Sequence, residues 1–82
     1  VDRPWDTAAS LLDARGLLCP LPVIRTQNRV KSMNEGELLD IVATDPGTLH
    51  DIPAWCRVHG HEVVGTERAR EIWIRLRVRR GQ

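Results

Sequence analysis

The strongest pattern in this 82-residue sequence is a strict alternation of apolar and polar residues near its end. The apolar positions are Ile72, Ile74, Leu76 and Val78, and between them stand Trp73, Arg75, Arg77 and Arg79. Because strand side chains point alternately to two faces, a period of two predicts a half-buried strand over residues 71–80. Such a strand buries its apolar face only against other elements, so the fold has to be built around a sheet.

Five further segments carry strand or helix patterns. The predicted strands are 10–14, 38–44 and 61–67, and the predicted helices are 20–33 and 47–59. Pro53 falls inside the second helix and should kink it or mark its start. The order βαβαββ predicts an α/β two-layer sandwich, with both helices on one face of a four-stranded sheet and the other face largely open to water.

The length and composition of the chain narrow the classes of protein to which it can belong. The length predicts one domain over residues 10–82 after a flexible lead-in at 1–9, where Trp5 is a candidate to dock on the body. Twelve basic against eleven acidic residues give a net charge of +1, which does not suggest a general nucleic-acid binder. We expect no membrane span, no signal peptide, no cofactor, no metal site and two free cysteines, and therefore a cytoplasmic protein.

A single thiol precedes two prolines in the stretch Leu18-Cys19-Pro20-Leu21-Pro22. Proline is favoured at the first position of a helix, so Cys19 is predicted to cap the first helix. The helix dipole would then favour thiolate and lower the cysteine pKa from about 8.5 to roughly 3.5–7.5. The alternative is a small buried apolar side chain. Cys56 shares a helix side with Leu49 and Ile52, which indicates a buried structural cysteine.

Arg75, Arg77 and Arg79 share one face of the last predicted strand, and Arg80 extends the row. One interpretation is a solvated face that prevents pairing with other sheets. The other is a docking surface for an acidic partner or tRNA.

Several short motifs follow one another along the chain. They are the segment 12–22 with Asp13, Gly16 and Cys-Pro-x-Pro, then Asp45-Pro46, Asp51-Ile52-Pro53 with Cys56, and Gly60-His61-Glu62. In this order and at this chain length, they resemble the TusA (SirA-like) family of sulfur carriers. The resemblance covers roughly residues 11–80, and it implies the sheet order 1-2-4-3 with strand 4 antiparallel to the rest.

The resemblance also implies a chemistry. Cys19 would accept a sulfane sulfur from a donor protein, a cysteine desulfurase or a rhodanese, hold it as a persulfide and pass it to an acceptor protein. The motif residues around it would be Pro20, Leu21, Pro22, Asp13 and Gly16. The protein would be a sulfurtransferase-type carrier rather than a stand-alone enzyme, and nucleic acid would be involved only indirectly.

Leu21 occupies a position where several tRNA-thiolation members of that family have glutamate. Both tRNA 2-thiouridine synthesis and dissimilatory sulfur oxidation therefore remain open as pathways. A second hypothesis is an interaction module that binds RNA or a regulator through the arginine row, with Cys19 structural. A third is a thiol enzyme acting on a small molecule, but the sequence places no second catalytic residue.

Overall fold

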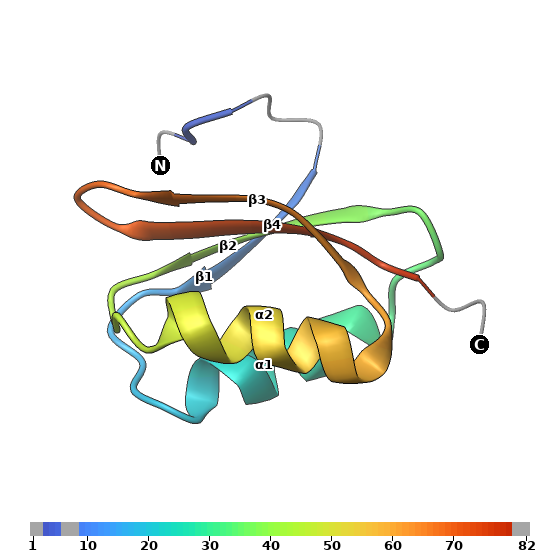
Figure 1. The fold of residues 1–82 in the computed structure, drawn as a ribbon, viewed down its shortest axis with the longest axis horizontal. Coiled ribbons are helices and arrows are strands. Elements are labelled where there is room, and N and C mark those ends of the chain that lie inside the picture. The colour runs from blue at the N-terminus through green and yellow to red at the C-terminus, as the bar shows by residue number, and fades with distance from the viewer. Residues whose placement is uncertain (1–2, 6–8, 80–82) are drawn as a thin grey trace.

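The computed structural model describes residues 3–5 and 9–79, and it has the predicted order βαβαββ. Figure 1 shows a sheet with both helices on one of its faces, which confirms the two-layer α/β sandwich. The elements are β1 (Ser10–Ala14), α1 (Leu21–Val30), β2 (Leu38–Ala43), α2 (Thr48–His59), β3 (Glu62–Arg68) and β4 (Ile72–Arg77).

The four strands form one mixed sheet in the order β1-β2-β4-β3, as the resemblance implied. β1 and β2 are parallel, whereas β4 is antiparallel to both of its neighbours. Leu12 lies beside Ile41 and Ile41 beside Ile74, so a row of apolar side chains crosses three strands on one face.

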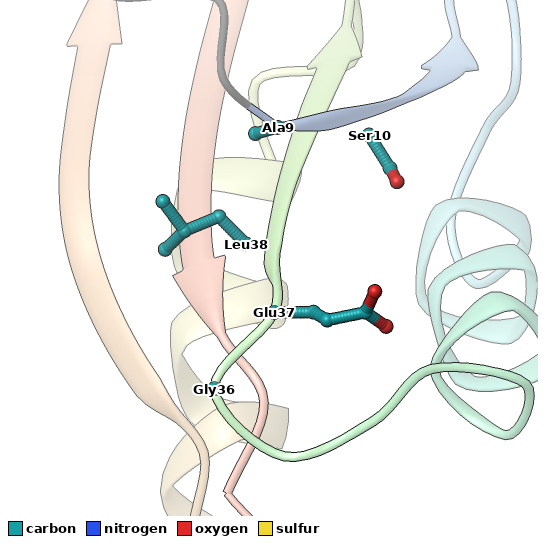
Figure 2. Close-up of a pocket in the computed structure, with 5 residues that line it drawn as sticks. All are labelled: Ala9, Ser10, Gly36, Glu37 and Leu38. Atoms are coloured by element: carbon teal, nitrogen blue, oxygen red, sulfur yellow. The ribbon is translucent and has the colours of Figure 1, made fainter.

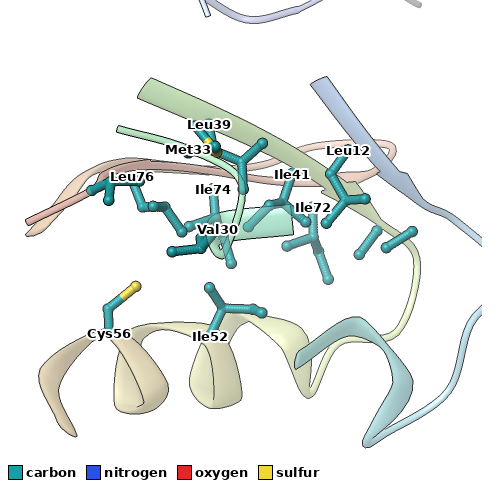
Figure 3. Packing of buried hydrophobic residues seen from close by; sticks show 13 residues of the cluster. Leu12, Val30, Met33, Leu39, Ile41, Ile52, Cys56, Ile72, Ile74 and Leu76 are labelled. Carbon is teal, nitrogen blue, oxygen red and sulfur yellow. The ribbon is translucent and has the colours of Figure 1, made fainter. Parts of the chain in front are cut away.

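The hydrophobic core lies between this row and the helices. Figure 3 shows Ile52 and Cys56 projecting from α2 toward the sheet, and α1 adds Val30. Without Phe or Tyr in the chain, Leu, Ile and Val supply most of this core. The sheet side of the core includes Leu12, Ala14, Leu39, Ile41, Ala43, Ile72, Ile74 and Leu76.

The first helix is shorter than predicted. It begins at Leu21 with Pro20 as its N-cap, and it ends at Val30 rather than at residue 33. The amides of Ser32 and Met33 donate to carbonyls three residues back, so the chain tightens into turns there. Met33 still reaches the core, which explains why its helical spacing misled the prediction.

Pro53 does not mark the start of the second helix, because α2 already begins at Thr48. Proline lacks the N–H that would otherwise bond to the carbonyl of Leu49. The helix ends at His59, and Gly60 caps it in a left-handed conformation.

The second sheet face is covered at its centre, contrary to the prediction that it would be largely open to water. Asp40 and Arg75 lie on it and are buried, and residues 3–5 pack over them. The Trp5 ring lies 5.4 Å from the Arg75 guanidinium, and a Cβ on Gly65 would be 3.1 Å from that ring. The sheet thus lies between the helices and residues 3–5 (Figure 1). Trp5 docks on the sheet at Arg75, as expected.

Candidate functional site

Cys19 lies in the connection between β1 and α1, one residue before the N-cap Pro20, and its side chain is exposed. Two hydrogen bonds tie this connection to the segment after β2. The Gly16 N–H donates to Thr44 Oγ1 at 2.9 Å, and the Cys19 N–H donates to Asp45 Oδ2 at 3.0 Å. Because β1 and β2 are parallel neighbours, the segments that follow them meet at the same edge of the sheet.

The two prolines have different surroundings. Pro22 is buried, and its carbonyl accepts a hydrogen bond from the buried Thr26 hydroxyl at 2.8 Å. Pro20 is exposed together with its neighbours Leu18, which is 71% exposed, and Leu21, which is 42% exposed. Pro22 thus anchors the start of α1, while exposed apolar residues both precede and follow Cys19 in the chain.

The electrostatics at Cys19 differ from the prediction. Hydrogen bonding to the Asp51 carboxylate raises the pKa of the Cys19 thiol, with further contributions from desolvation and from the negative charges of Asp51 and Asp45. Cys19 is also not the N-cap itself, so it stands farther from the helix start than predicted. This shift favours the thiol form and is opposite to the shift toward thiolate that the helix dipole predicted.

Asp13 and Gly16 shape the turn that leads to Cys19. Asp13 accepts hydrogen bonds from the Arg15 guanidinium at 2.7 and 2.9 Å and from the Arg15 N–H at 3.1 Å. These bonds lower the Asp13 pKa to about 2. Arg15 also lies 3.3 Å from Glu71, just before β4. Through these contacts Asp13 caps the turn.

Gly16 has φ +80°, a conformation that other residues adopt only with strain. A Cβ there would meet nothing within 4 Å, so only the backbone opposes a side chain. We expect Gly16→Ala to lower the free energy of unfolding by about 1–2 kcal/mol, measured by urea denaturation. The matched control is Gly47→Ala, at φ −60°, which should change stability by less than about 1 kcal/mol. Equal losses in both variants would contradict the backbone argument.

Cys56 is fully buried in the core, as its helical position indicated. Burial raises the pKa of this thiol to about 11, so it is unreactive in the folded protein. His59 and His61 stack against Trp55, with ring centroids 5.0 and 5.1 Å apart. Within residues 3–5 and 9–79, no group of three or more His, Cys, Asp or Glu side chains is arranged to hold a metal ion.

The arginine row is not a single exposed stripe. Arg75 is buried and forms a two-pronged ion pair with Asp40, with N–O distances of 2.7 and 2.9 Å. Arg77 and Arg79 are partly exposed and lie 3.6 and 3.1 Å from the same carboxylate of Glu62. Arg75 is therefore not available for docking, and Arg80 lies outside the described residues.

A pocket at the opposite end of the sheet is unrelated to Cys19. It lies where β1 and β2 begin, and Figure 2 shows Glu37 as the charged side chain among its lining residues. The others are Ala9, Ser10, Gly36 and Leu38, none of which is a strong nucleophile.

Neither helix of the described chain is long and apolar enough to cross a bilayer.

The roles of two carboxylates, Asp51 and Asp40, were not predicted from the sequence. Asp51 was named only as part of a motif. It lies near the start of the second predicted helix, which follows the strand at 38–44 and therefore begins near the end of the strand that leads to Cys19. The burial of Asp40 was not predicted either, although this residue lies inside an otherwise apolar predicted strand. A carboxylate in such a run is itself a signal, because a buried charge requires a partner.

Comparison with known proteins agrees with this site. A family model described as "Sulfurtransferase TusA" matches residues 10–80. "Sulfur carrier protein TusA" of Pseudomonas syringae pv. tomato is 44% identical over 73 residues, covering 84% of this chain and 86% of that protein. The protein of the same name from Pseudomonas paraeruginosa is 49% identical over 55 residues, or 67% of this chain and 70% of its own.

A Bacillus subtilis relative is much longer. The protein named "Putative sulfur carrier protein YrkF" is 46% identical over 74 residues, which is 90% of this chain but only 40% of that protein. The chain therefore spans less than half the length of this relative.

Proposed function

Because this chain belongs to the TusA family, we propose that it is a sulfur carrier in which Cys19 accepts a sulfane sulfur as a persulfide and relays it to an acceptor protein. The observation that carries this assignment is the contrast between the two thiols. Cys19 is exposed, whereas Cys56 is buried. A protein partner can reach only the first without unfolding the chain.

The proposed transfer is a thiol–persulfide exchange. The Cys19 sulfur forms a bond to the outer sulfur of the donor's persulfide, and the sulfur–sulfur bond within the donor breaks. The electron pair of that bond stays on the donor's cysteine, which also takes the proton that Cys19 gives up. The exchange balances without an oxidant or a reductant, and passing the sulfur on repeats it in reverse roles.

The surroundings of Cys19 suit docking of a protein better than binding of a small substrate. The apolar side chains of Leu18 and Leu21 are exposed beside the thiol. Exposed apolar groups that cluster around a reactive atom are typical of protein contact surfaces. We therefore assign the donor and the acceptor as proteins, with a cysteine desulfurase or a rhodanese as the donor class, in the reducing cytoplasm where free thiols persist.

Two pathways are compatible with this role, tRNA 2-thiouridine synthesis and dissimilatory sulfur oxidation. The alternative of an RNA- or regulator-binding module using Arg75, Arg77 and Arg79 loses its support, because Arg75 is buried against Asp40. In that alternative Cys19 would be structural, yet its side chain is exposed.

The direct test is to incubate the protein with a persulfide donor and weigh it intact. We expect one added sulfur, about 32 Da, that dithiothreitol removes. Peptide mapping should place the addition on Cys19 and leave Cys56 unmodified. An addition on Cys56 of the folded protein, or none at all on Cys19, would contradict the proposal.

A further inference from the structure

Two carboxylates act on Cys19, Asp45 from the segment after β2 and Asp51 from the first turn of α2, and the proposed transfer does not use them. Asp45 accepts the Cys19 N–H at 3.0 Å with one oxygen and the Gly47 N–H at 3.1 Å with the other. The Asp51 carboxylate lies on the same side, because a Cβ built on Gly47 would be 3.6 Å from Asp45 Oδ1 and 3.7 Å from Asp51 Oδ2. Asp45 therefore fixes the Cys19 backbone, and the neighbouring Asp51 carboxylate is the group with the largest effect on the Cys19 side chain.

We propose that Asp51 is a positioning residue for the Cys19 sulfur, whose S–H it accepts as a hydrogen bond, and that this contact keeps the empty carrier in its unreactive thiol form. The inference rests on the proposed function, and it adds a residue that controls when Cys19 reacts. The carrier then resists free electrophiles and oxidants, and it reacts when a docked donor takes over the proton during sulfur transfer.

The charges that act on the sulfur have opposite effects. Asp51, in the first turn of α2, and Asp45, in the segment after β2, raise the Cys19 pKa. The positive end of α1 favours the thiolate instead. Because hydrogen bonding to Asp51 is the largest contribution, removal of its charge should let the helix favour the thiolate.

The test uses a Cys56→Ser parent, so that Cys19 is the only thiol. Its alkylation by iodoacetamide is followed by intact mass from about pH 6 to pH 11, and the midpoint of the rate profile gives the Cys19 pKa. In Asp51→Asn we expect this midpoint to move to lower pH. For each unit of fall, the thiolate fraction near pH 7 rises about tenfold while thiolate nucleophilicity drops about threefold, so alkylation accelerates about threefold.

Two further variants separate a specific contact from a general loss of negative charge. Asp45→Asn should move the midpoint by less than Asp51→Asn does, because Asp45 bonds to the backbone N–H and not to the sulfur. Glu35→Gln removes an exposed carboxylate in the turn before β2, at the far end of the sheet, and should leave the midpoint unchanged. Thermal melts and circular dichroism confirm that each variant is folded before its profile is compared.

An unchanged midpoint in folded Asp51→Asn, or an equal shift in Asp45→Asn, would overturn the proposal. Absorbance of the thiolate near 240 nm provides a second readout, independent of the alkylating reagent, and must give the same order of variants. Neither measurement needs a sulfur donor. If the midpoint moves but no persulfide ever forms on Cys19, the carrier function fails while the role of Asp51 stands.

Discussion

Replacing Asp40 with alanine is expected to lower the free energy of unfolding by about 3–5 kcal/mol. Asp40 is fully buried and accepts hydrogen bonds from Arg75 at 2.7 and 2.9 Å and from Arg3 at 3.0 Å. Without the carboxylate, the buried Arg75 guanidinium keeps its charge but loses its two-pronged ion pair with Asp40. A small domain has about 5–15 kcal/mol of stability in all, so the variant should melt well over 10 °C lower. Thermal and urea denaturation measure the change.

The matched control is Asp13→Ala, which removes the carboxylate of an exposed ion pair with Arg15. The exposed pair should contribute only about 0–1 kcal/mol. The double variant Asp40→Leu/Arg75→Met removes both buried charges and should recover part of the lost stability. If Asp40→Ala costs no more than Asp13→Ala, the buried pair is not a significant source of stability.

The order of elements was predictable because each strand or helix carries its own local pattern. β1 at Ser10–Ala14 was predicted to the residue, since its short apolar run is followed directly by a turn at Gly16. Ends of helices were less predictable. Met33 has the right spacing for a longer α1, but it reaches the core from a turn that follows the helix. A local pattern shows which residues are buried, but it does not show whether they lie in a helix or in a turn.

The open sheet face was mispredicted because its cover comes from a segment without any pattern. Arg3, Pro4 and Trp5 carry no periodicity, yet Arg3 contacts Asp40 and Trp5 lies over Arg75. The arginine row therefore looked solvated in the sequence, although Arg75 is buried. A buried Asp40 within β2 and an arginine beside it in β4 form a long-range pair. Only the sheet register reveals such a pair.

Cys19 was singled out from local sequence, but the direction of its pKa shift was not predicted. The proline flanks and the position before a helix were enough to single out the thiol. The Asp51 carboxylate that raises its pKa arrives from the start of α2, and Asp45 is 26 residues away in sequence. The dipole of α1 acts on Cys19 together with negative charges from Asp45, which precedes α2, and from Asp51 in its first turn, and these charges oppose it.

Replacing Cys19 with serine is expected to abolish sulfur loading completely, the largest effect expected of any single change. A serine hydroxyl forms no stable persulfide, and Cys56 cannot substitute because it is buried and its pKa is raised to about 11. Incubation with a persulfide donor followed by intact mass should give no added sulfur in Cys19→Ser. The wild type should gain about 32 Da under the same conditions.

Cys56→Ser is the matched control, because it makes the same chemical change at the other thiol. It should load sulfur as the wild type does, yet unfold about 1–3 kcal/mol more easily, since a hydroxyl replaces an apolar group in the core. The two variants thus exchange phenotypes: Cys19→Ser is stable and inactive, whereas Cys56→Ser is destabilised and active. If folded Cys56→Ser fails to load, or if Cys19→Ser loads as the wild type does, the exposed thiol is not the carrier site.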